Sequence, residues 1–276
     1  MLKTNTYLTL AAAVLLTLAG CKQSDPPEIG REGDIVEFSG YTWTVKTSDT
    51  PVGPGPNLFS ERFSDVYVDG NGWLHMRISQ YNNQWWASEV VGTDVVGYGR
   101  YEWTVGSDVQ NLPSNLVVGL FTWDNNTFQE AANSEVDIEF SRWGNDNAAS
   151  PLTYSVQPVS FGDFFAERTH HSTANPSPLT GVSTHVFNWT DSLVTWESYE
   201  GDVAAGEPFA TWSFDLNNPA RQKVEGGNTS DPIIIPTPGA TTNARINFWI
   251  LPHLNPAPQD EEEHELIVRR FRYTPF

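Results

Sequence analysis

Cysteine and basic side chains are scarce in this chain of 276 residues. Cys21 is the only cysteine, which excludes an intrachain disulfide bond. The chain has 15 Lys and Arg residues but 34 Asp and Glu residues, so its formal net charge is −19 at pH 7. A charge of that sign disfavours nucleic acids and anionic membrane surfaces as partners. Heavily sulfated or uronate-rich polymers are disfavoured for the same reason, unless basic residues gather locally.

Motifs for several common enzyme chemistries are also missing. The sequence contains no G-x-S-x-G, H-E-x-x-H, phosphate-loop or dinucleotide-binding pattern. Its six His residues show no metal-ligand spacing, so neither a metal site nor a required cofactor is predicted. We expect His170 and His171 to be a solvated pair in a loop, and His185 to be a hydrogen-bonded structural residue. The acidic stretch 260–265 is interpreted as a solvated loop, with a structural Ca²⁺ site as the alternative.

The first 20 residues have the layout of a secretory signal peptide. Their uncharged apolar run, Leu8–Gly20, is shorter than the roughly 20 residues that a membrane-spanning helix needs. The run ends in "LAGC", which resembles the bacterial lipobox, so we expect Cys21 to carry a lipid. Lys22 rather than Asp follows it, which in such lipoproteins indicates the outer membrane of the cell envelope. The predicted organisation is a signal peptide at 1–20, a polar tether at 21–34 and one domain at 35–276.

Apolar and polar residues alternate with a period of two along much of the predicted domain. The stretch 65–78 alternates on both sides of Asp69-Gly70-Asn71-Gly72, which is a strong β-hairpin signal. No convincing amphipathic helix of ten or more residues is present. Short strands separated by turn signals predict an all-β sandwich. Further strands are predicted at 98–105, 115–123, 184–190, 193–198, 245–251 and 264–275, and longer loops at 51–60, 161–178 and 221–242.

Three carboxylates occupy every second position of "NSEVDIEFSRWG", residues 133–144. In a β-strand, Glu135, Asp137 and Glu139 project from one face, while the apolar residues between them face the core. Neighbouring carboxylates raise at least one pKa, because the site resists holding all the charges at once. Retaining glycoside hydrolysis needs one ionised carboxylate and one protonated carboxyl about 5–5.5 Å apart. The Cα atoms of Glu135 and Glu139 would lie about 13 Å apart in an extended strand, so both side chains must lean inward.

A solvent-exposed strand face and a calcium site are the alternative interpretations of this triplet. Phe121, Trp123 and Trp143 lie close to the acids in sequence, and the chain has as many as 11 Trp residues. Aromatic rings beside paired carboxylates are typical of a sugar-binding cleft. The pattern therefore favours a carbohydrate-active site over a solvated face.

"EVDIE" matches the E-x-D-x-E active-site signature of glycoside hydrolase family 16, the group of lichenases, laminarinases and agarases. The chain resembles this family from about Phe38 to Pro275. The resemblance implies a concanavalin A-like β-jelly-roll sandwich of two antiparallel sheets. Beyond the acidic triplet it is carried by "SEVVGTDVVGYGRYEWTV" at 88–105, "HVFNWTDSLVTWES" at 185–198, "RINFWIL" at 245–251 and "ELIVRRFRYTP" at 265–275.

The resemblance assigns a role to each acid of the triplet. By position, Glu135 is similar to the family nucleophile, Asp137 to its assisting acid and Glu139 to its general acid/base. The unbulged E-x-D-x-E form resembles the branch that acts on β-1,4 or mixed β-1,3/1,4 glucans.

Further residues are expected to bind substrate, most of them because they match cleft positions of lichenases. Lichenases carry an Arg two residues after the Glu that Glu89 matches, but Val91 occupies that position here. We expect Arg142, just past the acidic strand, to supply a different sugar contact. The predicted substrate-binding residues are Glu89, Phe121, Trp123, Arg142, Trp143, Asn247 and Trp249.

The sequence therefore predicts a lipid-anchored, retaining endo-β-glycanase that acts on a polysaccharide as a monomer. Contact with a membrane is expected through the N-terminal lipid only, and on which side of the membrane the domain lies stays open. A transglycosylase of the same family would use identical residues. A non-catalytic, glycan-binding surface lipoprotein is the alternative from another class. Both Glu135 and Glu139 are present, which favours the enzyme.

Overall fold

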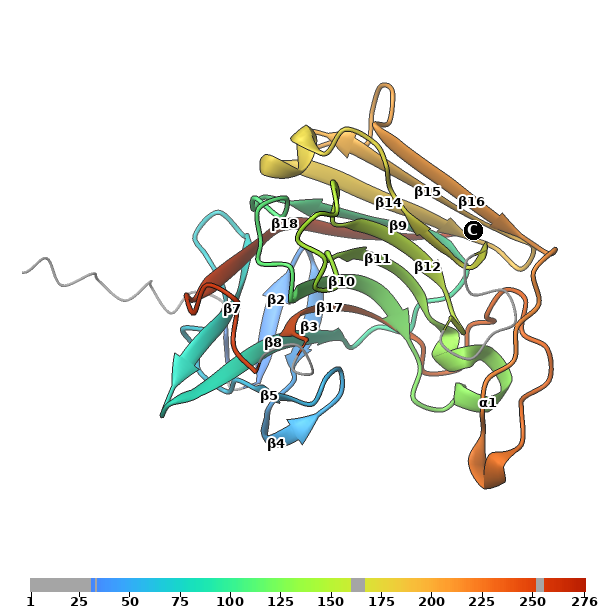
Figure 1. Cartoon of the computed structure of the whole chain (residues 1–276), viewed down its shortest axis with the longest axis horizontal. Coiled ribbons are helices and arrows are strands. Elements are labelled where there is room, and N and C mark those ends of the chain that lie inside the picture. The colour runs from blue at the N-terminus through green and yellow to red at the C-terminus, as the bar shows by residue number, and fades with distance from the viewer. Residues whose placement is uncertain (1–30, 33, 160–166, 252–255) are drawn as a thin grey trace, which may run out of the picture.

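The computed structural model describes residues 31–32, 34–159, 167–251 and 256–276, and these are built almost entirely from β-strands (Figure 1). The predicted signal peptide and most of the predicted tether lie outside the described residues. No helix in the described ranges has the length and apolar character needed to cross a membrane. The helical elements described are α1 (Phe128–Ala131) and the 3₁₀ turns η1 (Ala132–Ser134), η3 (Ser177–Thr180) and η4 (Glu225–Gly227).

Two sheets pack face to face. We call the first the concave sheet; its strand order is β13-β12-β11-β10-β17-β8-β3-β2-β1. Its strands are β1 (Arg31–Glu32), β2 (Ile35–Phe38), β3 (Tyr41–Val45), β8 (Gln84–Gly92), β10 (Leu116–Trp123), β11 (Val136–Phe140), β12 (Leu152–Val156), β13 (Thr169–His171) and β17 (Asn243–Ile250).

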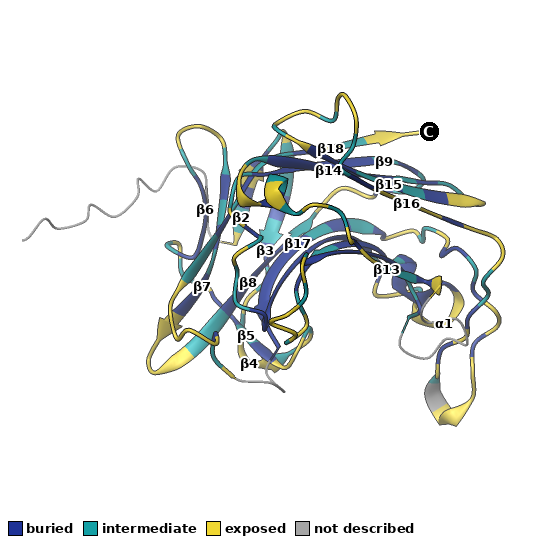
Figure 2. Cartoon of the chain, turned by 45° about the horizontal axis from the view of Figure 1, so that its top comes forward, coloured by how far each residue is buried: buried dark blue, intermediate teal, exposed yellow. Residues whose placement is uncertain are grey.

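The second, which we call the outer sheet, has the order β16-β15-β14-β9-β18-β7-β6. Its strands are β6 (Val66–Val68), β7 (Leu74–Tyr81), β9 (Gly99–Val105), β14 (Ser183–Trp189), β15 (Leu193–Glu200), β16 (Ala210–Asp215) and β18 (His264–Pro275). Figure 2 shows the concave sheet curving away from the outer sheet, so that its hollow side is left uncovered by that sheet. The predicted all-β sandwich of jelly-roll type is confirmed.

A small third set of pairings joins the two sheets at one end. The hairpin of β7 and β8 passes from one sheet to the other. Strand β4 (Ser48–Val52) pairs with β5 (Asn57–Phe59), and β5 pairs with β8 in parallel. This parallel pair departs from the purely antiparallel arrangement that the sequence predicts.

Large aromatic residues fill the space between the sheets. Trp43, Trp103, Trp189 and Trp196 are fully buried there, which accounts for part of the high Trp content. Trp196 also fixes the acidic strand from its core side, because its Nε1 donates to the carbonyl oxygen of Asp137 at 3.0 Å. The core thus supports the backbone that carries the acids.

All the predicted strands and the β6–β7 hairpin are present, but the predicted loops contain short elements. The stretch 51–60 contains the end of β4 and all of β5, the described part of 161–178 contains β13 and the start of η3, and 221–242 contains η4. His170 is therefore not part of a solvated pair, since its ring is stacked 6.2 Å from Tyr154 and 5.7 Å from Trp212. His185 is buried and hydrogen-bonded to Ser183 and Ser198, as predicted.

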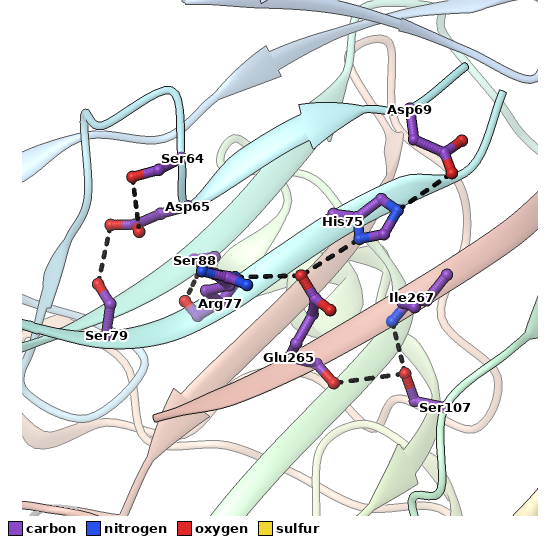
Figure 3. Close-up of polar contacts among 10 residues, drawn as sticks. All are labelled: Ser64, Asp65, Asp69, His75, Arg77, Ser79, Ser88, Ser107, Glu265 and Ile267. Atoms are coloured by element: carbon purple, nitrogen blue, oxygen red, sulfur yellow. Dashed lines mark hydrogen bonds and ion pairs between the residues drawn. The ribbon is translucent and has the colours of Figure 1, made fainter. Parts of the chain in front are cut away.

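A polar cluster lies on the solvent side of the outer sheet (Figure 3). Nδ1 of His75 lies 3.2 Å from Oε1 of Glu265 on β18, and its Nε2 lies 3.5 Å from Oδ2 of Asp69 in the β6–β7 turn. Arg77 pairs with the same Oε1 of Glu265 at 3.0 Å, and the ring of Tyr67 stacks on His75. These contacts connect the hairpin to β18.

Candidate active site

Residues from four neighbouring strands form a row across the hollow side of the concave sheet. Glu139 of β11 pairs with Gly119 of β10, Gly119 with Asn247 of β17, and Asn247 with Glu89 of β8. Gly119 has no side chain, so the row is open at this position. A Cβ atom there would lie 2.5 Å from Oδ1 of Asn247, so no larger residue fits beside that side chain.

The next row brings an arginine into the site. Asp137 pairs with Phe121, Phe121 with Arg245, and Arg245 with Val91. Since residues two apart in a strand project from the same face, both rows face the hollow side of the sheet. The position where Val91 departs from the lichenase pattern is thus paired with an arginine from the adjacent strand.

Glu135 stands just before β11 and is fixed by the strand beside it. The hydroxyl of Thr122 donates to the carbonyl oxygen of Ser134 at 2.8 Å and accepts from the backbone N–H of Val136 at 3.2 Å. Residues 132–134 all have positive φ, between 46° and 60°, a conformation that costs energy for residues other than glycine. The chain therefore enters the acidic strand through a strained turn that Thr122 holds in place.

These rows enclose a cavity of about 340 Å³. Eight of the ten predicted catalytic and substrate-binding residues line it. The lining consists of Lys46, Gly53, Pro54, Glu89, Gly119, Phe121, Trp123, Asn125, Glu135, Asp137, Glu139, Arg245, Asn247 and Trp249.

Burial dominates the electrostatics of the three acids. It raises the pKa of Glu135 well above its usual range, and the charges of Asp137 and Glu139 raise it further. Burial and the charge of Asp137 likewise raise the pKa of Glu139. The pKa of Asp137 is also raised by burial, although hydrogen bonds from Gln157 and Glu135 oppose the shift. Such a site holds at least one proton near neutral pH, as acid catalysis requires.

Polar contacts keep the other side of the cavity rigid. Glu89 is almost completely buried and pairs with Lys46 at 2.9 Å and with Arg245 at 3.2 Å. Oδ1 of Asn247 is buried and has no hydrogen-bond partner among the described residues. A hydroxyl of a bound ligand could supply the missing donor.

Arg142 and Trp143 lie outside this lining. The guanidinium of Arg142 donates to the carbonyl oxygens of Gln110, Leu112 and Ala148, and the predicted sugar contact of Arg142 stays a prediction. These donors hold the loop after β11. Trp143 is 39% exposed, and its ring centre lies 6.4 Å from that of Trp249, so it extends the aromatic surface beside the cavity.

Sequence reasoning did not single out several residues that shape the site: Lys46, Gly119, Gln157 and Arg245. A signal existed for Arg245, because it stands two residues before Asn247 on the same predicted strand and so shares its face. Gly119 follows in the same way from the alternation in 115–123. Nothing in the sequence near Lys46 or Gln157 indicates their contacts.

Within the part of the chain that the structure describes, no three His, Cys, Asp or Glu side chains are arranged to hold a metal ion. The Ca²⁺ alternative at 260–265 stays an expectation. In that stretch, Asp260 lies 3.0 Å from the ring of His264.

The fold is of the type found in β-glucanases of glycoside hydrolase family 16. The β-glucanase of Bacillus licheniformis superposes with a TM-score of 0.58 at 16% identity, over 91% of this chain and 97% of that chain. A β-1,3-1,4-glucanase (lichenase) from a mouse hindgut metagenome superposes with a TM-score of 0.54 at 17% identity, over 89% of this chain and 95% of that chain.

A third similar structure is described as an immunostimulatory antigen and pseudo β-1,3-glucanase of Mycobacterium tuberculosis. It superposes with a TM-score of 0.59 at 18% identity, over 90% of this chain and 95% of that chain. No protein-family model and no curated protein sequence matches the chain. At such identities the likeness establishes a shared fold, and activity has to be argued from the site.

Proposed function

We propose that this protein is a retaining endo-acting glycoside hydrolase that cleaves a β-linked polysaccharide by double displacement. The observation that carries the proposal is the position of Glu135, Asp137 and Glu139 together in one cavity on the hollow side of the concave sheet. Aromatic rings and an unpaired amide oxygen share that cavity, which suits a sugar ring with its apolar faces and polar edge.

In the first step, the carboxylate of Glu135 attacks the anomeric carbon while Glu139 gives its proton to the departing glycosidic oxygen. The bond to the leaving sugar breaks, and a covalent ester forms between Glu135 and the glycosyl group. In the second step, Glu139 takes a proton from water, which attacks the same carbon and releases Glu135. Asp137 stands between the two and shares a hydrogen bond with Glu135, so it can take up charge as the nucleophile reacts.

Sugar binding falls to the residues around the triad. Trp123 and Trp249 offer ring faces, Asn247 an acceptor oxygen, and Glu89 a carboxylate that two cations hold in place. We extend the proposal to β-glucan or a related plant or algal glycan as substrate. A transglycosylase would differ only in using a sugar hydroxyl in place of water.

The cellular setting is proposed from the N-terminal sequence alone. Cys21 carries the lipid, 1–20 is removed, and 22–34 tethers a monomeric domain to the outer membrane. Loss of envelope association in a Cys21→Ser variant is the result that this setting requires.

A second candidate function is glycan binding without hydrolysis. It is favoured by one observation, namely that a structure with the same fold is described as a pseudo β-1,3-glucanase. The retention of all three acids argues against it for this chain.

The deciding experiment measures release of reducing ends by the chain starting at Lys22, on a panel of neutral and sulfated β-glycans. The matched variant is Glu135→Gln, which keeps the shape of the side chain but not its charge. We expect activity on at least one polymer, and a loss of about 10³-fold or more in the variant. Binding to a polymer that neither form cleaves would replace the hydrolase with the binding function.

A further inference from the structure

Gln157 follows β12, the strand that pairs with the acidic strand β11 (Figure 1). Its backbone N–H donates to the carbonyl oxygen of Glu135 at 3.3 Å, which continues the pairing of the two strands by one step. Ser155 is paired with Asp137, and residues two apart share a face, so the Gln157 side chain projects to the hollow side of the sheet. There its Nε2 donates to Oδ2 of Asp137 at 3.2 Å. One residue thus contacts two of the three acids.

The amide of Gln157 can offer Asp137 only a donor. Its Oε1 accepts from the backbone N–H of Val159 at 3.0 Å. A backbone N–H cannot accept a hydrogen bond, so the amide oxygen has to face Val159 and the amide NH₂ has to face Asp137. Turning the amide around would place two donors 3.0 Å apart and two acceptors 3.2 Å apart. The structure therefore fixes the direction of this hydrogen bond.

The main chain that carries this amide is held by Arg168, which is fully buried. The guanidinium of Arg168 donates to the carbonyl oxygens of Gln157 and Pro158 at 2.6 and 3.1 Å. It also donates to the carbonyl oxygen of Asn218 at 2.6 Å, and it lies 4.9 Å from the centre of the Phe214 ring. Arg168 thus ties the end of β12 to the segment after β16, which keeps Gln157 beside the acids.

We propose that Gln157 is a positioning residue that holds Asp137 by Oδ2, so that Oδ1 takes the proton of Glu135 when Glu135 becomes the nucleophile. A proton on Oδ2 would meet the N–H of Gln157, so Asp137 can take up a proton only on its other oxygen. The proton leaves a carboxyl oxygen of Glu135 and binds to Oδ1, and the total charge of the pair is unchanged. This inference rests on the proposed function, with Glu135 as the nucleophile.

The same hydrogen bond favours the ionised form of Asp137. Burial raises the pKa of Asp137 to about 7, and the hydrogen bonds from Gln157 and Glu135 oppose that shift. The other ionisable groups on the elements around Asp137 stay the same in a Gln157 variant, so a further shift can be assigned to Gln157. They are Glu89, Glu135, Glu139, Lys46 and Arg245 in the cavity, and Arg168, His170 and His171 on the side of β12 and β13.

The first test is the pH dependence of kcat/KM for wild type and Gln157→Met on the polymer that the wild type cleaves. Methionine keeps the length of the side chain but has no donor. We expect the acidic limb, which reports the ionisation of the Asp137–Glu135 pair, to move up by about one pH unit, with about a tenfold loss below the limb. An acidic limb that stays in place would overturn the proposal.

Gln80→Met is the matched control, because it makes the same chemical change at an exposed position of β7. Its pH profile should equal that of the wild type. A limb that moves as far in Gln80→Met as in Gln157→Met would count against a specific role for Gln157.

A double-mutant cycle tests whether Gln157 acts through Asp137. Gln157→Met is introduced into wild type and into Asp137→Asn, and kcat/KM is compared at one pH below the acidic limb. If the effect passes through Asp137, Gln157→Met should change kcat/KM by less than about twofold in the Asp137→Asn background. A loss as large as in the wild-type background would mean that Gln157 acts by another route, and the proposal would fail.

A further readout does not depend on activity. The side-chain carboxyl carbons of Asp are labelled with ¹³C, the signals are titrated by NMR, and Asp137→Asn identifies the signal of Asp137. The midpoint for Asp137 should rise by about one pH unit in Gln157→Met, and an unchanged midpoint would refute the role of Gln157. A wild type that cleaves no polymer, with a midpoint that rises as expected, would refute the proposed function alone.

Discussion

At the scale of single residues, the three acids work against the stability of the folded chain. A carboxyl whose pKa is raised on folding binds its proton more tightly in the folded state than in the unfolded state. Its contribution is therefore most favourable below the unfolded pKa and is lost as the pH rises through the folded pKa. Glu139 is such a group, since burial and the charge of Asp137 raise its pKa.

Glu139→Gln should consequently unfold less readily than the wild type at pH 7. We expect a gain of about 1–2 kcal/mol in the free energy of unfolding, which shrinks below pH 4 where Glu139 is protonated in both states. Urea denaturation at pH 7 and pH 4 measures it, with the exposed Glu207→Gln as control. Equal or lower stability of Glu139→Gln at pH 7 would contradict the destabilising effect ascribed to the three acids.

At the scale of elements, His75 joins the β6–β7 hairpin to β18 through Asp69 and Glu265. Burial lowers the pKa of His75, but the contacts with Glu265 and Asp69 outweigh it, so the pKa is raised. The other ionisable neighbours are Arg77 and the stacked Tyr67. A raised His pKa contributes stability that is fully present below the unfolded value and is lost as the pH rises through the folded value.

His75→Gln should therefore be less stable than the wild type at pH 5.5, by about 1 kcal/mol, with the difference shrinking by pH 8.5. Chemical denaturation at the two pH values checks this. The control is His171→Gln, since His171 is exposed on the edge strand β13. A difference that is the same at both pH values would mean that His75 acts through packing and not through its charge.

Strands were easier to predict than the contacts between them. The sequence patterns identified β10, β17 and β18 to within two residues, because each is a run of seven or more residues rich in apolar and β-branched or aromatic side chains. The short strands β5 and β13 were assigned to loops, since three residues rich in turn formers or His carry too little pattern. The carbonyl partners of Arg142 were not predicted for a related reason: proximity in sequence says nothing about which carbonyl oxygens a loop turns toward it.

The same limit applies to the prediction of the site residues. The acidic triplet and the positions on 115–123 and 245–251 were found because each strand repeats its own face. The neighbours of these residues depend on strand order, which no local pattern contains. Arg245 lies beside Val91, and Lys46 pairs with Glu89, although β17, β8 and the segment after β3 lie far apart in sequence.

At the scale of the whole molecule, the net charge of the chain acts over long distances, whereas the charges that line the cavity act on a substrate at short range. The chain carries a net charge of −19, which repels anionic polymers at a distance. Inside the cavity, Lys46 and Arg245 lie beside four acids, and burial raises the pKa of three of these, Glu135, Asp137 and Glu139. Salt separates the two effects, because screening over about 10 Å at 0.1 M weakens the long-range field more than contacts within the cavity.

We therefore expect kcat/KM on a neutral β-glucan to change less than about twofold between about 20 mM and 0.5 M NaCl. On a partly carboxymethylated form of the same glucan, kcat/KM should rise several-fold over that range, as salt screens the repulsion between polymer and protein. Initial rates on the two polymers, matched in chain length, measure the effect. Faster cleavage of the carboxymethylated polymer at low salt would show instead that Lys46 and Arg245 attract anionic substrates more strongly than the chain as a whole repels them.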